Sequence, residues 1–398
     1  MLLILFFGVI SLMGDIIYEG ARSVNGPYLQ TLGANAVIVG VVVGLGEFLG
    51  YIIRLVSGYF SDKSKMHWVF TFLGYGMLMA VPLLALTGFW QIAAVFMILE
   101  RLGKGIRSPA KDTLLSHATK QVGTGIGFGI AEFLDQFGAT IGPLIFTFYF
   151  LSLRRTQITI HDYQTGYSLL WIPLVVLMIF LSVAYLKVKN PEDLEVAQTT
   201  PVQEAGLSKV FWIYSLFSFI TTVGFINFAI IGFHWKAQGI LSDDLIPLLY
   251  AVAMIIDAVF GIVIGKQYDS LKLKYGKDQA GLLILVVIPI ITAILLMFIF
   301  AVNILLILIA ILLWGIVMGA HETVMKAGIA DITPKSKRGT GYGLFNVIYG
   351  IALFVGSVLT GYLYEVSVIL LIGINILFEV FAILLYYLLR REITRKTE

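Results

Sequence analysis

The sequence predicts an all-α membrane protein whose twelve transmembrane helices form two pseudo-symmetric six-helix bundles. Three observations predict this fold class. Of the 398 residues, 59% are hydrophobic and only 13% are charged, which is far more apolar than an average soluble domain. Apolar runs long enough to cross about 30 Å of hydrocarbon recur along the whole chain. A polar interval near the midpoint divides these runs into two sets of six.

The apolar runs set the bounds of the expected helices. We place them at residues 2–31, 37–60, 67–88, 91–115, 123–151, 168–188, 209–234, 244–267, 279–301, 303–330, 339–364 and 366–389. The first run has no basic segment ahead of it and no small-residue cleavage site before its charged residues. We therefore expect a retained helix rather than a signal peptide. Cysteine is absent, which excludes disulfides and thiolate metal sites.

Basic residues are concentrated on one side of the predicted membrane. With the loop after the first helix placed outside, the outer loops contain only Arg154, Arg155 and Lys236, whereas every inner loop and the tail contain several lysines or arginines. The positive-inside rule then places both termini in the cytoplasm. We expect a multi-pass protein of the plasma (inner) membrane.

The least apolar interval is the polar stretch 189–208, which contains two prolines and no helical apolar stripe. We expect it to be a cytoplasmic linker between an N-terminal bundle, 1–188, and a C-terminal bundle with a short cytoplasmic tail, 209–398. Short motifs recur on either side of it. "GYFSDK" follows the second apolar run and "GKQYDS" follows the eighth, so two related halves are expected around a site near the membrane midplane.

These motifs resemble those of the major facilitator superfamily along nearly the whole chain. The turn Gly58-x-x-x-Asp62-Lys63 resembles the loop signature between its second and third helices, and Arg101 resembles its buried arginine of helix 4. Gly129, Gly138 and the pair Gly142-Pro143 have the spacing of the antiporter signature of the twelve-helix drug–proton antiporters. Phe146 and Thr147 replace the last glycine pair of that signature.

The resemblance implies a secondary active transporter that works by alternating access. Asp62 is expected to be a latch at a helix end, where a carboxylate can accept backbone N–H groups and pair with a neighbouring cation. Glycines along one helix face allow close packing and sliding of neighbouring helices. The residues expected to take part in gating are Gly58, Asp62, Lys63, Gly129, Gly138, Gly142, Pro143 and Asp269.

Charged residues inside the apolar runs are candidates for function, because each costs about 2.5–3.5 kcal/mol on insertion scales. At about 100° per residue, Asp15, Glu19 and Arg22 share one helix face. A buried carboxyl group favours its neutral form and a nearby arginine favours its charged form, so breaking such a pair can load or release a proton. The residues expected to couple protons are Asp15, Glu19, Glu47, Arg101, Glu132 and Asp135.

The C-terminal half has fewer charges and more aromatic candidates for lining a cavity. A pocket of aromatic residues with few polar groups suits an amphipathic or hydrophobic ligand. The residues expected to bind substrate are Arg22, Asn227, Phe228, Trp314, His321, Glu322, Asn346 and Tyr349.

The first functional hypothesis is therefore proton-coupled export of amphipathic or hydrophobic small molecules. The second is proton-coupled uptake or exchange of an organic anion that Arg22, Arg101 or Lys104 would neutralise. The third is a lipid-moving protein or a sensor on the same scaffold. No phosphate-binding loop, catalytic triad or metal-spaced ligand set is found, so we expect no enzyme, no cofactor and no metal. The expected partners are a small-molecule substrate, protons and the lipid bilayer, with no nucleic acid, and the expected state is a monomer.

Overall fold

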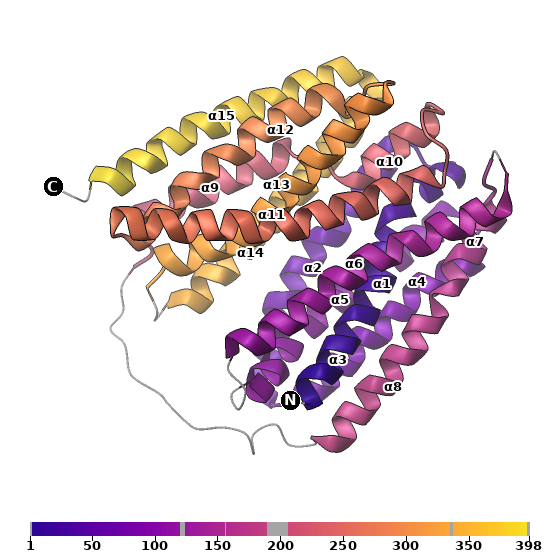
Figure 1. Ribbon diagram of the computed structural model, residues 1–398, viewed down its shortest axis with the longest axis horizontal. Coiled ribbons are helices and arrows are strands. Elements are labelled where there is room, and N and C mark those ends of the chain that lie inside the picture. Colours follow the sequence, from indigo (N-terminus) through magenta and orange to yellow (C-terminus); the bar gives the residue numbers. More distant parts are fainter. Residues whose placement is uncertain (1, 120–123, 156, 189–205, 335–336, 396–398) are drawn as a thin grey trace. The chain divides into compact units, whose positions relative to one another are not determined.

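The computed structural model describes residues 2–119, 124–155, 157–188, 206–334 and 337–395 (Figure 1). All regular structure in these residues is helical. The α-helices are α1 (Leu2–Thr31), α2 (Ala36–Ser64), α3 (His67–Gly76), α4 (Ala80–Leu83), α5 (Trp90–Thr119), α6 (Thr124–Leu153), α7 (Ile160–Leu169), α8 (Trp171–Lys187), α9 (Lys209–Gly224), α10 (Phe228–Ala237), α11 (Leu245–Tyr275), α12 (Val287–Phe298), α13 (Ile304–Ile332), α14 (Arg338–Val366) and α15 (Val368–Arg395). The 3-10 helices are η1 (Met77–Met79), η2 (Leu84–Leu86) and η4 (Asp278–Val286).

The helices make up the predicted set of membrane spans. Eleven helical spans in the described residues are long and apolar enough to cross a membrane. The twelfth is α5, which is as long as its neighbours but carries charged residues from Glu100 to Asp112 that lower its hydropathy. The prediction of an all-helical, twelve-span membrane protein is confirmed.

The chain divides into two units by its internal contacts. Unit 1 consists of Met1–Thr199 together with Phe228–Ala251, and unit 2 consists of Thr200–Asn227 together with Val252–Glu398. A short segment from the second half of the sequence, α10 with the start of α11, therefore packs within unit 1. Its contact with α1 is close, because a Cβ atom on Gly26 would lie 1.9 Å from the carbonyl oxygen of Ala229.

Two of the expected spans differ from the prediction in their course. The sixth begins at Ile160 rather than at residue 168, because Thr159 and Asp162 form a capping box that starts α7 within a segment expected to be a loop. The seventh is interrupted, since α9 ends at Gly224, Phe225 is extended, and α10 begins at Phe228. The indole Nε1 of Trp314 donates to the carbonyl oxygen of Ile226 at 3.0 Å, which satisfies one backbone group that the interruption releases.

Glycines allow the closest helix contacts in unit 1. A Cβ atom on Gly142 of α6 would lie 2.4 Å from the carbonyl oxygen of Ile16 and 2.7 Å from the amide nitrogen of Gly20, both on α1. Between α2 and α5, a Cβ atom on Gly105 would lie 2.4 Å from the carbonyl oxygen of Gly50. Such close approach increases van der Waals contact, which drives helix association in lipid.

Unit 2 has its own core of buried aliphatic and aromatic side chains. Phe211 and Phe217 of α9, Leu285 of η4, Ile329 of α13 and Leu389 of α15 are among its members. In Figure 1 the yellow α15 runs beside the pink α9, and the two helices pack extensively on each other.

The glycine packing gives the first prediction. Replacement of Gly142 by Ala places a methyl group against backbone atoms of α1, which cannot yield as a flexible side chain would, so we expect a loss of about 1–3 kcal/mol in stability. The matched control is Gly76→Ala, because nothing lies within 4 Å of a Cβ atom at that position. Thermal unfolding in detergent should show a lower Tm for Gly142→Ala alone, and equal Tm values for the two variants would contradict the packing.

Candidate functional site

Five charged side chains from α1, α2 and α5 form a buried or half-buried ion-pair network in unit 1. Glu47 is at its centre, because its Oε1 lies 3.9 Å from Nη2 of Arg22 and 3.5 Å from Nε of Arg101. Arg22 also lies 3.6 Å from Glu19, one turn earlier on α1. Arg101 also lies 3.5 Å from Glu100, its neighbour on α5. Each arginine is therefore shared between two carboxylates.

The aromatic ring of Tyr18 contacts both arginines of this network and also Lys104. Nζ of Lys104 lies 3.5 Å from the ring centroid, and Cζ of Arg101 and of Arg22 lie 4.3 Å and 5.9 Å from it. Tyr18 is only 3% exposed, so these cation–π contacts act in a largely dry environment, where they are strongest. The sequence analysis missed Tyr18, although it precedes Arg22 by four residues and shares its helix face.

Tyr250 joins the network from the start of α11. Its hydroxyl donates to Oε2 of Glu19, and its ring packs edge-on against Phe228 at a centroid distance of 4.5 Å. Phe228, which was predicted to bind substrate, thus lies in unit 1 beside the carboxylates. Tyr250 was not predicted, because a tyrosine within an apolar run gives no signal of the helix that it contacts.

A second ion pair lies nearby, between α5 and α6. Nζ of Lys111 donates to Oγ of Ser11 at 3.0 Å and lies 3.8 Å from Oδ2 of Asp135. Oδ1 of Asp135 is buried without a hydrogen-bond partner. One turn farther along α6, a Cβ atom on Gly138 would lie 3.1 Å from Cβ of Asp15. The structure therefore brings Asp15 and Asp135 to the same part of the α1–α6 contact.

Glycines of α2 make room for Arg101. A Cβ atom on Gly46 would lie 2.9 Å from Cγ of Arg101, and one on Gly50 would lie 3.1 Å from the Arg101 carbonyl oxygen. The aliphatic part of the Arg101 side chain thus packs against the glycine backbone of α2, and its guanidinium group reaches Glu47. A longer side chain at either glycine would move the guanidinium group.

The other residues predicted for proton coupling and gating lie outside this network. Glu132 is exposed on α6, one turn before Asp135. Asp62, Lys63 and Asp269 are also exposed, on α2 and α11. The remaining predicted gating residues are glycines and a proline: Gly58 packs near Pro109, Gly138, Gly142 and Pro143 are buried in α6, and the surroundings of Gly129 lie outside the described residues.

The predicted substrate-binding residues of unit 2 form an aromatic group at the interruption between α9 and α10. Phe225 packs against Trp314 and His321 at centroid distances of 5.6 Å and 5.4 Å. Nδ1 of His321 lies 3.3 Å from the hydroxyl of Tyr349. Of the other predicted residues, Asn227 and Asn346 are half-buried and Glu322 is exposed. Phe225 was not predicted.

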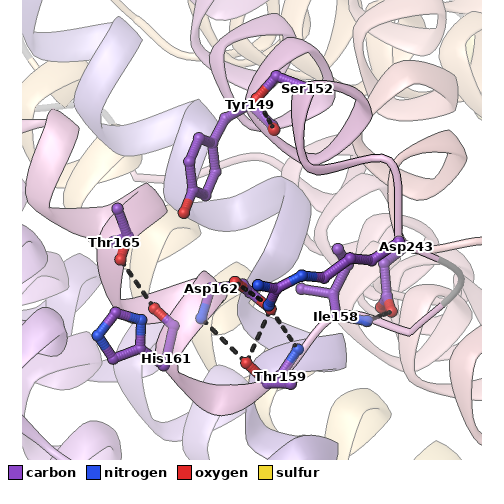
Figure 2. A network of polar contacts seen from close by, with 9 residues as sticks. Tyr149, Ser152, Ile158, Thr159, His161, Asp162, Thr165 and Asp243 are labelled. Carbon is purple, nitrogen blue, oxygen red and sulfur yellow. Dashed lines mark hydrogen bonds and ion pairs between the residues drawn. The ribbon is translucent and has the colours of Figure 1, made fainter.

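A polar network at the predicted external end holds α10 and α11 to α7 within unit 1 (Figure 2). Asp243 accepts hydrogen bonds from the backbone N–H of Ile158 at 3.4 Å, from the hydroxyl of Tyr163 and from the ammonium group of Lys236. Beside it, Asp162 lies 3.3 Å from Arg155. Two of the three basic residues expected in the outer loops therefore pair with acids at this end.

A pocket between α2 and α3 lies apart from these networks. It has a volume of about 410 Å³, and apolar side chains such as Val56, Phe60 and Leu73 line it. None of the charged residues of the ion-pair network lines it. An apolar groove of this kind suits contact with lipid.

Comparison with known sequences identifies relatives of the whole chain. A family model described as Major Facilitator Superfamily matches residues 3–325 and, in a second match, residues 240–398. An uncharacterized protein of Mycobacterium tuberculosis is 36% identical over 390 residues, which cover 96% of this chain and 92% of that protein. An uncharacterized MFS-type transporter of Methanocaldococcus jannaschii is 29% identical over 370 residues, covering 90% of this chain and 88% of that protein.

Solved structures show the same fold at low sequence identity. A bacterial homologue of the human lysosomal transporter Spinster, inward-facing and occupied, has a TM-score of 0.70 at 12% identity, covering 98% of this chain and 96% of that chain. The nucleoside transporter NupG has a TM-score of 0.68 at 12% identity, covering 98% of both chains. A POT family transporter in complex with a thioalcohol-conjugated peptide has a TM-score of 0.74 at 11% identity, covering 99% of this chain and 96% of that chain.

The Tyr18 ring gives the second prediction. Tyr18→Leu removes the aromatic face that Lys104 and Arg101 contact, so we expect it to be about 2 kcal/mol less stable than Tyr18→Phe, which keeps the ring. Thermal unfolding of the two variants in detergent measures the difference. Equal losses of Tm in Tyr18→Leu and Tyr18→Phe would show that the ring does not stabilise these cations.

Proposed function

We propose that this chain, which belongs to the Major Facilitator Superfamily, is a proton-coupled exporter of amphipathic or hydrophobic small molecules. A secondary transporter rather than an enzyme follows from the family itself and from the transporter structures that share its fold. The observation that carries the coupling proposal is the network in unit 1, where Glu47 lies within ion-pair distance of both Arg22 and Arg101.

The chemistry of this network suits proton transfer linked to helix movement. Removing one partner of a buried ion pair leaves an uncompensated charge, which costs several kcal/mol. When α1 moves away from α2 and α5, Glu19 keeps Arg22 on the same helix but Glu47 loses it, and a proton taken up by Glu47 removes the excess negative charge. Asp15 and Asp135 are the second pair of carriers, since Lys111 compensates Asp135 at the α1–α6 contact.

The same movement requires the predicted external end to open. In unit 1, α1 packs on α10 at Gly26, and Asp243 binds Lys236, Tyr163 and the backbone of Ile158. We infer that these contacts close the external side in one half of the cycle. The distribution of basic residues supports cytoplasmic termini on both ends of the chain. We infer that the protein works as a monomer in the plasma (inner) membrane.

The substrate class is inferred from the aromatic residues. Phe225, Trp314 and His321 in unit 2 present flat apolar surfaces with few hydrogen-bonding groups, which suits an amphipathic or hydrophobic ligand. The cations of unit 1 are already shared among carboxylates, which disfavours an anionic ligand. Exchange of an organic anion is nevertheless the alternative, because Arg22, Arg101 and Lys104 gather around one ring.

The third prediction separates these two functions by the sign of a pH effect. If an amphipathic substrate binds the state in which the carboxylates of unit 1 are deprotonated, substrate binding releases protons and becomes tighter as the pH rises. A thermal-shift screen against drugs, lipids, sugars and organic acids at pH 6 and pH 8 should then show a larger stabilisation by amphipathic compounds at pH 8. Organic anions that bind together with a proton would stabilise more at pH 6.

Neutral variants test whether the carboxylates predicted to carry protons cause this pH dependence. Asp15→Asn, Glu19→Gln and Asp135→Asn each replace a carboxylate by an amide of the same shape, so at least one of them should abolish the pH dependence of the ligand-induced shift. Glu392→Gln is the matched control, because Glu392 belongs to unit 2, where it pairs with the exposed Lys209, and is not a member of the network. An unchanged pH dependence in all three variants would overturn the assignment of carriers.

The fourth prediction concerns the external contact. Because the chain contains no cysteine, Ala229→Cys introduces a single thiol at the buried contact between α1 and α10. In that background, Asp243→Asn should weaken closure and speed maleimide labelling of the purified protein about tenfold for each 1.4 kcal/mol lost. Asp244→Asn is the control, since it changes the adjacent acid. Equal labelling rates in both variants would contradict a closing role for Asp243.

A further inference from the structure

Glu379 on α15 is a buried acid that the proton-coupling proposal does not use. Its exposed fraction is 0%, and its Oε2 accepts a hydrogen bond of 2.7 Å from the hydroxyl of Thr221 on α9. Its Oε1 is buried without a hydrogen-bond partner. Among the described residues, no basic side chain forms an ion pair with this carboxylate. An acid in such a place needs a positive partner or a proton.

The contacts of α15 fix what surrounds Glu379. Lys209 at the start of α9 lies 2.7 Å from Glu392 near the end of α15, and Thr221 near the end of α9 bonds to Glu379, so the two helices run antiparallel. One turn from Glu379 toward the start of α15, Asn375 is therefore level with the point where α9 ends. A Cβ atom on Gly224 would lie 2.5 Å from Oε1 of Glu379, so the carboxylate touches the last residue of α9.

The electrostatics of this place favour a bound cation. The C-terminal end of a helix carries partial negative charge, and its last carbonyl groups lack the usual intrahelical partners. In α9 the carbonyl oxygen of Thr222 accepts from the N–H of Phe225 at 3.3 Å, which leaves its neighbours as possible ligands. The carboxylate of Glu379 adds a second negative group at the same end. Asn375 is 0% exposed, and neither its Oδ1 nor its Nδ2 has a hydrogen-bond partner. The hydroxyl of Thr222, on the same stretch of α9, is also buried without a hydrogen-bond partner.

We propose that Glu379, Asn375, Thr221 and the carbonyl groups at the C-terminal end of α9 form a binding site for Na⁺. The donors are all oxygens, which hard cations prefer. One carboxylate neutralises a monovalent ion, whereas a divalent ion would leave a buried positive charge. A proton on Oε1 would neutralise the acid but would engage only one further oxygen as a hydrogen-bond donor, whereas a cation binds several oxygens at once. No group of three His, Cys, Asp or Glu side chains that could hold a metal is found in the described part of the chain.

The site goes beyond the proposed function, because it lies in unit 2 and does not depend on proton transfer in unit 1. It also has a consequence for the aromatic group. Phe225, which contacts Trp314 and His321, directly follows Gly224 at the end of α9. An ion that fixes the end of α9 therefore fixes the position of Phe225, so Na⁺ sets the shape of the surface expected to bind substrate.

The test measures thermal stability of the purified full-length protein in detergent. NaCl, LiCl, KCl and choline chloride are compared at constant ionic strength and at pH 6 and pH 8. We expect NaCl to raise the Tm of the wild type by several degrees in a saturable manner relative to choline chloride. Glu379→Gln keeps an acceptor for Thr221 but loses the charge, so it should abolish the sodium effect. Glu392→Gln, a change of the same kind on the same helix, should keep it.

Asn375→Ala and binding of radioactive ²²Na⁺ provide the second line of evidence. Asn375→Ala should weaken the apparent sodium affinity at least tenfold without removing the carboxylate, and it carries the test if Glu379→Gln does not fold. Three results would overturn the proposal: no sodium-dependent shift and no ²²Na⁺ binding in the wild type, a sodium effect that both variants retain, or a Tm that depends on pH through Glu379 but not on sodium. The last result would assign a proton to Glu379 instead.

Discussion

Charges buried inside an apolar helical bundle must be compensated where they lie, and the architecture of unit 1 follows from that constraint. Glu47 compensates Arg22 and Arg101 together, and the ring of Tyr18 takes up part of the positive charge that Arg101 and Lys104 add. These contacts join α1, α2 and α5 at short range. They are possible only because bare glycine backbone, at Gly46 above all, lets α2 and α5 approach closely enough for Arg101 to reach across.

The two units meet the same constraint in different ways. Unit 1 places acids and bases side by side. A carboxylate that loses its basic partner when a helix moves can therefore be neutralised by a proton instead. In unit 2, Glu379 lies against the C-terminal end of α9 with a hydroxyl donor and no cationic side chain among the described residues. We propose that Na⁺ compensates it. This difference suits a division of tasks in which one unit handles protons and the other fixes the aromatic surface through Na⁺.

The sequence was informative wherever the signal lay within one helix. Hydropathy predicted the twelve spans, and helical periodicity placed Asp15, Glu19 and Arg22 on one face, of which Glu19 and Arg22 do pair. The start of α7 was readable from Thr159 and Asp162, which have the spacing of a capping box. The sequence analysis missed this helix start because the flanking residues are polar, and it placed the span from hydropathy rather than from the capping residues.

Contacts between helices were much harder to predict. Tyr18 and Tyr250 are ordinary residues of apolar runs, and only the packing of α1 against α5 and α11 shows that they touch charged groups. The interruption after Gly224 likewise depends on Trp314, which lies far away in the sequence. The sequence analysis found the acids because a charged residue inside an apolar run has a high free energy of membrane insertion. The residues that pair with these acids are identified only by the fold. The roles of the individual acids are proposals that the structure motivates by proximity.

Coupling itself is tested most directly by uphill transport in proteoliposomes, using a ligand that the thermal-shift screen shows to stabilise the protein. With an acidic lumen and no sodium gradient, the wild type should accumulate this ligand above its external concentration, and nigericin should abolish the accumulation by collapsing the pH gradient. Accumulation into an alkaline lumen, or accumulation that nigericin leaves unchanged, would contradict proton-coupled export.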